Sequence, residues 1–209
     1  MGGEESNDMR PLFFSPEFSM NFVWRDRFNL RAGSVRPHNK KQISEGLRNM
    51  SPESIRNRFL GSKREFSDTE LKYLTTLDGW NHYAIGIEER DGQKRGIAIV
   101  RLVRSSHDIH EAEVAVTIID DYQRKGLGSF LLNLIILAAM ERDIHTLSFT
   151  FLPFNDGIIK IINKVGVPYP GPQNSDYVQL FLDVKKYDVN EVKSRLTKTL
   201  PEILNFNFP

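Results

Sequence analysis

A short turn, Gln123-Arg124-Lys125-Gly126-Leu127-Gly128, has the residue types needed to hold a phosphate group. It follows an alternating apolar stretch and precedes an apolar helix, so its backbone amides lie at a helix N-terminus without helical acceptors. These amides and the helix dipole together attract anions. Gly126 and Gly128 permit close approach of the backbone to phosphate oxygens, and Arg124 and Lys125 add positive charge. We therefore expect a pyrophosphate site here.

Two well-known phosphate-binding motifs fit this turn less well. A Walker-type loop requires G-x-x-x-x-G-K-[ST], which the sequence lacks. A dinucleotide fingerprint requires a third small residue, but Leu131 stands there, and the preceding sheet is expected to be antiparallel. An ordinary structural glycine turn is the remaining alternative.

The elements that must position this turn are predicted from periodicity and caps. Glu111 to Ile119 alternates as a strand, and Ser129 to Arg142 is apolar on all sides, as in a buried helix. Further strands are expected at Phe28 to Arg31, Trp80 to Glu88, Arg95 to Val103, Thr146 to Leu152 and Tyr177 to Val184, and further helices at His38 to Met50, Pro52 to Leu60, Asp68 to Leu77, Asn155 to Val165 and Val189 to Leu196. This order predicts a mixed α/β sheet in one domain.

The Q-x-x-G-x-G turn between a strand and an apolar helix resembles motif A of the GNAT acetyltransferase superfamily. Asn155 to Val167 resembles the helix-and-turn pattern that follows it. Leu30 to Pro37, Ser51-Pro52-Glu53-Ser54, Arg58-Phe59 and Phe66-Ser67-Asp68 resemble the acetyltransferase module of bacterial protein lysine acetyltransferases. The resemblance covers about residues 28 to 184 and implies a mostly antiparallel, splayed central sheet flanked by helices.

The resemblance also implies a cofactor, acetyl-CoA, and residues that bind it. Thr117 to Ile119 match the strand that carries the pantetheine arm, the amides from Gln123 to Ser129 match the pyrophosphate site, and Asn155 matches a pantetheine contact. The expected cofactor-binding residues are Thr117, Ile118, Ile119, Gln123, Arg124, Lys125, Gly126, Leu127, Gly128, Ser129 and Asn155. No metal is expected.

Glu113 matches the general base of this family. An ammonium group must lose a proton before it can attack a thioester, and a nearby carboxylate can accept that proton directly or through water. Glu111 shares the strand face of Glu113, and His110 is another candidate. Many relatives place a tyrosine as the acid where Ile162 stands here; Tyr169 can replace it only if its proline-rich loop folds over the site.

Composition narrows the function classes. Lys+Arg 28 against Asp+Glu 27 argues against general nucleic-acid binding, and the absence of cysteine excludes thiolate nucleophiles and cysteine-bound metals. Met1 to Arg10 has no apolar signal core, and the longest apolar run, Leu134 to Met140, is far shorter than the roughly 20 residues of a membrane span. We expect a cytoplasmic protein with no membrane partner.

Residues 27–185 are predicted to form the acyltransferase domain, preceded by an aromatic-rich arm (1–26) and followed by a helical extension (186–209). The arm is expected to pack either on its own domain or in a homodimer. The basic run Arg56, Arg58, Lys63 and Arg64 is predicted to be a solvated helix face; the alternative is contact with the 3′-phosphate of CoA or with an acidic substrate. The predicted function is transfer of acetyl from acetyl-CoA to an amine, on a protein lysine or a small molecule, by direct attack in a ternary complex; the alternative is a non-catalytic acyl-CoA sensor.

Overall fold

The computed structural model describes residues 12–25, 27–92, 94–174 and 176–200. The strands are β1 (Ser19–Trp24), β2 (Phe28–Ser34), β3 (His82–Glu89), β4 (Gly96–Arg104), β5 (Glu111–Ile118), β6 (Thr146–Phe151), β7 (Tyr169–Gln173) and β8 (Val178–Asp183). The helices are α1 (Lys40–Arg48), α2 (Pro52–Phe59), α3 (Asp68–Thr75), α4 (Leu127–Met140), α5 (Asp156–Val165) and α6 (Val189–Thr199). Short 3-10 turns lie at Pro37–Asn39, Asp120–Tyr122 and Val184–Lys186.

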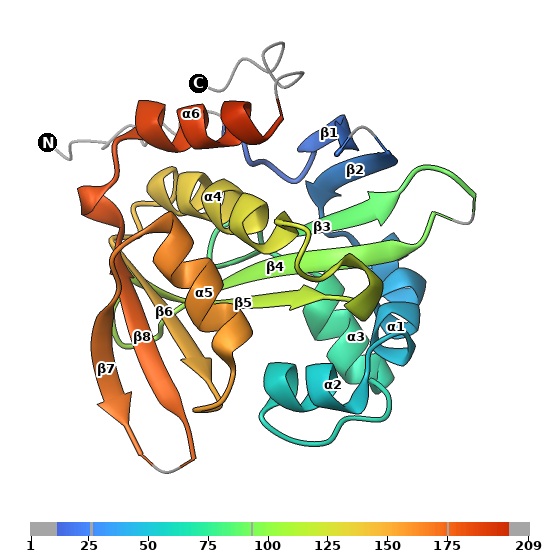
Figure 1. Ribbon diagram of the computed structural model, residues 1–209, viewed down its shortest axis with the longest axis horizontal. Coiled ribbons are helices and arrows are strands. Elements are labelled where there is room, and N and C mark those ends of the chain that lie inside the picture. Colours follow the sequence, from blue (N-terminus) through green and yellow to red (C-terminus); the bar gives the residue numbers. More distant parts are fainter. Residues whose placement is uncertain (1–11, 26, 93, 175, 201–209) are drawn as a thin grey trace, which may run out of the picture.

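All eight strands form one sheet in the order β1-β2-β3-β4-β5-β6-β8-β7. Neighbours are antiparallel except β5 and β6, which run parallel and pair only from Glu111–Thr146 to Glu113–Ser148. Beyond Glu113 the two strands separate (Figure 1). The predicted mixed α/β fold with a splayed sheet is confirmed.

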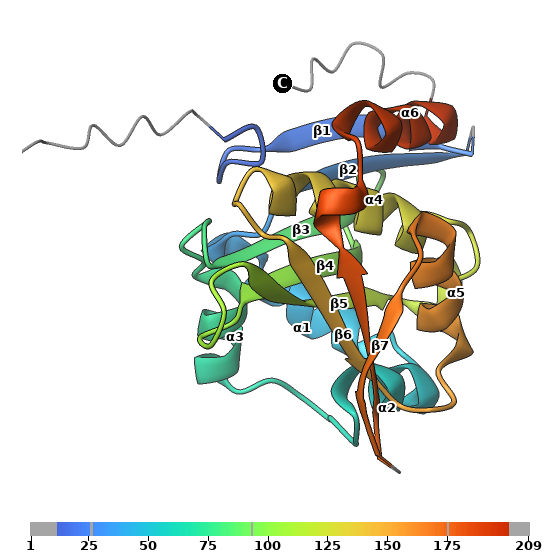
Figure 2. The ribbon, with the colours of Figure 1, turned by 90° about the vertical axis from the view of Figure 1, so that its left-hand side faces the viewer.

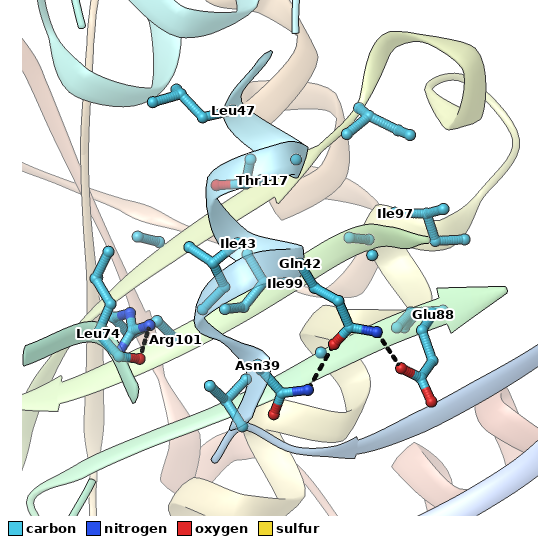
Figure 3. Close-up of a pocket in the computed structure, with 18 of the residues that line it drawn as sticks. Asn39, Gln42, Ile43, Leu47, Leu74, Glu88, Ile97, Ile99, Arg101 and Thr117 are labelled. Carbon is cyan, nitrogen blue, oxygen red and sulfur yellow. Dashed lines mark hydrogen bonds between the residues drawn. The ribbon is translucent and has the colours of Figure 1, made fainter. Parts of the chain in front are cut away.

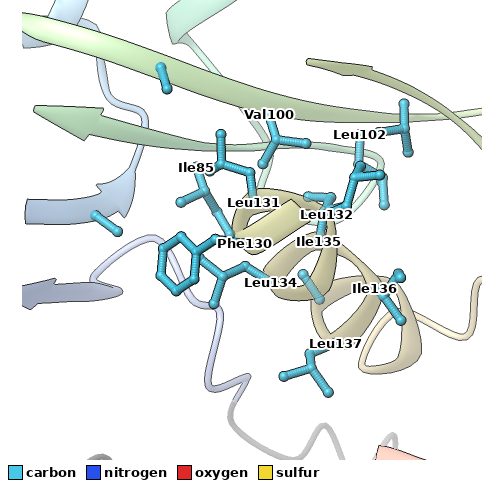
Figure 4. Packing of buried hydrophobic residues seen from close by; sticks show 14 of the residues in the cluster. Ile85, Val100, Leu102, Phe130, Leu131, Leu132, Leu134, Ile135, Ile136 and Leu137 are labelled. Carbon is cyan, nitrogen blue, oxygen red and sulfur yellow. The ribbon is translucent and has the colours of Figure 1, made fainter. Parts of the chain in front are cut away.

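Helices cover both faces of the sheet. Helices α4 and α5 lie on one face and α1 to α3 on the other (Figures 1 and 2). Helix α4 is buried along almost its whole length, because the sheet lies beneath it, α5 and α6 pack against its other sides, and Phe22 and Trp24 of β1 contact its Phe130. Figure 4 shows its leucine and isoleucine side chains against Ile85, Val100 and Leu102 of β3 and β4. The apolar composition of this helix therefore follows from its central position.

Two predicted caps form as expected. Ser51 accepts a hydrogen bond from the amide of Ser54 at the start of α2. Ser67 and Glu70 form a reciprocal capping box at the start of α3. These caps supply acceptors for amides that a helix start leaves unpaired, and they fix where the two helices begin on the face opposite α4.

The sheet has two strands that periodicity did not predict. They are β1 and β7, and β1 lies within the predicted aromatic arm. The arm packs on its own domain, which was one of the two expectations for it, since Phe14, Phe18, Phe22 and Trp24 are buried in the core. Residues 1–11 of that arm and 201–209 of the predicted extension lie outside the described residues. No described helix is long and apolar enough to cross a bilayer.

Candidate active site

The turn between β5 and α4 presents unpaired backbone amides. Arg124 adopts a left-handed φ of 56° and Gly126 a φ of 91°, which turns the chain sharply into α4. Within the described chain, no backbone acceptor pairs with the amides from Arg124 to Ser129. Because they lie at the N-terminus of a 14-residue helix, the dipole adds to their attraction for an anion.

The side chains of this turn have different roles. Gln123 donates through Nε2 to Ser54 Oγ (2.9 Å) and to the Ile118 carbonyl (3.0 Å), so it ties the turn to α2 and β5. The Lys125 ammonium donates to the Asp121 carbonyl. The exposed Arg124 guanidinium has no hydrogen bond or ion pair with any described residue. Arg124 is therefore the side chain of this turn that is free to meet an anion.

The two glycines are required for different local reasons. Gly126 needs its positive φ, and the Trp24 indole lies beside it, donating to the Lys125 carbonyl at 3.1 Å. A Cβ on Gly128 would lie 2.5 Å from Cδ1 of Ile161. Gly128 thus allows α5 to pack closely against the first turn of α4, in addition to any approach of phosphate.

The free edge of β5 borders the opening between β5 and β6. The Ile119 amide donates to Ile97 (3.0 Å), and Glu111 accepts from Ser105 (2.8 Å), so the odd-numbered residues of β5 bond to β4. Because antiparallel pairing alternates, Val114 and Val116 point their backbone groups toward β6; the parallel pairing at Glu113–Ser148 uses the Val114 amide, so the Val114 carbonyl and both backbone groups of Val116 face the opening. Sequence reasoning selected Thr117 to Ile119 and missed these two valines, since periodicity does not reveal which strand edge is free.

Asn155 lies at the other side of the opening, after β6. Its Oδ1 accepts from the Ile158 amide at 3.3 Å and caps α5. Its side-chain NH₂ has no partner among the described residues and can donate to a ligand in the opening. One side chain therefore both fixes the start of α5 and offers a polar contact.

Glu113 is exposed on β5 at the point where pairing with β6 ends. On the same strand face, Arg58 Nε of α2 donates to Thr117 Oγ1 at 2.8 Å. Burial lowers the pKa of Arg58, and the charge of Glu113 partly opposes this. The prediction that Arg58 belongs to a solvated helix face is wrong, because its guanidinium packs against β5.

The other predicted acid–base candidates lie elsewhere. His110 donates to the Asp143 carbonyl (2.9 Å) and stacks on His145 with ring centroids 4.2 Å apart. Ile162 is fully buried. Tyr169 stacks on Phe181 in the edge pair β7–β8, and its own strand β7 is three strands away from β5, so its segment does not fold over the opening.

A basic cavity of about 560 Å³ adjoins the turn. Its walls include the turn itself, the end of β1, and the C-terminal parts of α5 and α6. Arg25, Lys125, Lys164, Arg195 and Lys198 line it, and it has no acidic lining residue among those described. Sequence reasoning missed this cluster because its members come from four distant segments.

A second cavity of about 120 Å³ lies between α1 to α3 and strands β2 to β5 (Figure 3). At one end Glu88 accepts from Gln42 and forms a salt bridge with Arg31 (3.0 Å). Gln42 accepts in turn from Asn39 at 2.6 Å. Most of the remaining wall is apolar, and Arg58, Arg101 and Thr117 complete it.

Known proteins resemble this chain in sequence and in fold. Acetyltransferase Pat of Mycolicibacterium smegmatis is 31% identical over 132 residues, which are 63% of this chain and 39% of that protein. Acetyltransferase PA5475 of Pseudomonas aeruginosa is 30% identical over 103 residues, which are 49% of this chain and 55% of that protein. The matches thus span about two fifths and just over half of these relatives.

Among solved structures, the GNAT domain of S. lividans PAT superposes with a TM-score of 0.72 at 24% identity, covering 83% of this chain and 99% of that one. Spermidine N-acetyltransferase from Vibrio cholerae, in complex with CoA and spermine, gives 0.60 at 16% identity over 76% and 97% of the two chains. The family model "Acetyltransferase (GNAT) domain" matches residues 36–167, more than half of the sequence. The chain therefore belongs to the GNAT acetyltransferase family.

Proposed function

We propose that this chain transfers an acetyl group from acetyl-CoA to an amine by direct attack in a ternary complex. The observation that carries the proposal is the continuity of three features: unpaired amides at the start of α4, a free edge of β5, and a carboxylate where that edge begins. A phosphate-bearing, amide-containing cofactor is complementary to the first two, and the carboxylate supplies a base beside its far end.

In this proposal the amides from Arg124 to Ser129, with the Arg124 guanidinium, hold the pyrophosphate. The pantetheine amides pair with the free edge of β5, and Asn155 donates from the opposite side. The basic cavity takes the phosphorylated adenosine end, because its lining has several cations and no described acidic residue, although Arg195 is paired with Glu191 outside the lining. The predicted contacts at Thr117, Ile118 and Ile119 then lie beside Val114 and Val116 on the same strand.

The reaction needs one base and no covalent enzyme intermediate. Glu113 accepts a proton from the acceptor ammonium, directly or through water, and the free amine attacks the thioester carbon. The tetrahedral intermediate collapses as the carbon–sulfur bond breaks, which releases the amide and CoA. The thiolate takes its proton from water or leaves unprotonated, since a thiol pKa is well below that of an alcohol and Ile162 offers no proton.

The test is the Glu113→Gln variant, assayed with acetyl-CoA against a panel of amines and peptides. Turnover at neutral pH should fall by roughly 10²–10⁴-fold, the usual contribution of positioned acid–base catalysis, and high pH should restore part of it. Acetyl-CoA affinity should change little, because none of the proposed cofactor contacts uses the Glu113 side chain. Glu111→Gln, two residues earlier on the same face, is the matched control.

Nearly full turnover in Glu113→Gln would exclude Glu113 as the base. If the wild-type protein bound acetyl-CoA but acetylated nothing in the panel, the chain would act as an acyl-CoA sensor instead. Calorimetry of the same samples separates these outcomes, because it measures cofactor binding without turnover.

A further inference from the structure

The cavity beneath α1 combines apolar walls with two guanidinium groups. Ile43 and Leu47 of α1 face Ile97 and Ile99 of β4 across it (Figure 3). Arg58 enters from α2 and Arg101 from β4. Ala115, which pairs directly with Arg101, and Thr117 connect the cavity to β5. It therefore lies beside the proposed reaction site.

The two arginines are held in place by neutral partners. Arg101 is buried; it donates to the Leu74 carbonyl (2.7 Å) and to His82 Nε2. Arg58 is held by Thr117. Neither forms a salt bridge with a carboxylate in the described part of the chain, whereas Glu88 at the other end is paired with Arg31.

The local charge balance is positive. Burial lowers the pKa of Arg101 to about 10, and repulsion from the nearby guanidinium of Arg58 contributes to this shift. Glu113 attracts Arg58, but burial is the larger influence on Arg58. Burying a charge costs free energy, and an opposite charge at hydrogen-bond distance reduces that cost. An anion between the two groups would supply that partner.

We propose that this cavity binds a small carboxylate-bearing substrate, with its apolar body between α1 and β4 and its carboxylate at Arg58, supported by Arg101. The inference names a substrate class for the proposed acyltransferase site. An apolar cavity of about 150 Å³ accommodates benzene, so the 120 Å³ here suits a group of similar size. A cationic side chain such as lysine would be repelled there.

The first test uses wild-type protein and three ring compounds of similar size: benzoate, benzamide and benzylamine. Calorimetry or ligand-observed NMR should show benzoate binding about 10- to 100-fold more tightly than benzamide, as expected for a charge-assisted hydrogen bond. Benzylamine should not bind. Equal affinity for benzoate and benzamide would overturn the proposal without any variant.

The second test compares Arg58→Gln with Arg56→Gln, an exposed arginine on the same helix. Benzoate affinity should fall about 10- to 100-fold in the first variant and remain unchanged in the second. Arg58→Lys, which keeps the charge, should recover part of the affinity and provides a substitute if Arg58→Gln does not fold. An equal response of the Arg56 and Arg58 variants would refute the assignment.

The carboxylate can come from the donor or from the acceptor. If the enzyme prefers succinyl-CoA to acetyl-CoA and this preference disappears in Arg58→Gln, the acyl group carries the carboxylate. If the enzyme prefers γ-aminobutyrate to butylamine and this preference disappears in Arg58→Gln, the acceptor carries the carboxylate. Benzoate binding without any turnover would support the carboxylate site and contradict the proposed acetyltransferase activity. The experiment therefore distinguishes failure of the site from failure of the proposed function.

Discussion

Arg142 is a fully buried guanidinium that joins three segments far apart in sequence. Its Nη2 donates to the carbonyls of Phe14 (2.7 Å) and Gly79 (2.8 Å), its Nε donates again to Gly79 (3.0 Å), and its Nη1 donates to Ala138 (2.8 Å). The guanidinium carbon also lies 4.1 Å from the centroid of the Tyr83 ring. Arg142 thereby attaches the N-terminal segment and the turn before β3 to the end of α4.

The Arg142→Met variant tests this attachment, because methionine keeps an apolar stem but has no donor. A carbonyl left buried without a partner costs about 1–3 kcal/mol, and loss of a desolvated cation–π contact costs about 2 kcal/mol. Relief from burying a charge offsets part of this, since burial lowers the pKa of Arg142 and the nearest carboxylate, Glu141, is 3.8 Å away. We expect a net loss of about 3 kcal/mol in the free energy of unfolding.

Urea denaturation at neutral pH measures this loss. Arg90→Met is the matched control, because Arg90 is exposed at the end of the β3–β4 hairpin, and it should change the free energy of unfolding by less than about 0.5 kcal/mol. If Arg142→Met unfolded within about 1 kcal/mol of wild type, the hydrogen bonds of this guanidinium would contribute little and the reasoning would be refuted.

Two further predictions concern packing and pH. Gly128→Ala should lower the free energy of unfolding by about 1–3 kcal/mol through overpacking, because the added Cβ would lie 2.5 Å from Cδ1 of Ile161. The double variant Gly128→Ala/Ile161→Val, which removes that methyl group, should recover part of the lost stability. If the effects of the two substitutions simply added, this contact would not be the cause. Burial and Arg101 lower the pKa of His82 from 6.5 to about 4. The unfolded state then binds more protons in that interval, so wild-type stability should fall as pH drops from 6.5 to about 4. NMR titration of the His82 ring tests this directly; a midpoint near 6.5 would contradict it.

Local patterns predicted most of the elements. The caps at Ser51 and Ser67 depend on side chains within three residues, and the apolar helix depends on its own composition, so each was readable without tertiary contacts. Strand β7 was not readable because Pro170 and Pro172 are unusual in strands; they are tolerated here at the sheet edge, where one side needs no ladder hydrogen bonds.

The candidate site was only partly readable. The turn at Gln123 to Gly128 is contiguous, so its sequence alone indicated a phosphate site. Arg58 gave no such signal, because its contact with Thr117 joins residues 59 positions apart. The basic cavity likewise depends on the ends of β1, α5 and α6 meeting beside the turn that starts α4, an arrangement that no single segment encodes.

The geometry of β5 also bears on the choice between its two glutamates. Glu111 and Glu113 share a strand face, so the alternation of the strand alone does not say which of them lies nearer the opening between β5 and β6. Pairing with β6 covers the strand edge from Glu111 through Glu113 and ends there. The free part of this edge begins at Val114. A pantetheine arm that runs from the α4 turn and pairs its amides with this edge would therefore end beside Glu113. Glu111 lies two residues farther on, about 7 Å at the usual strand rise, where β6 already occupies the edge. A base at Glu113 therefore needs no displacement of β6, whereas a base at Glu111 would require the two strands to separate further.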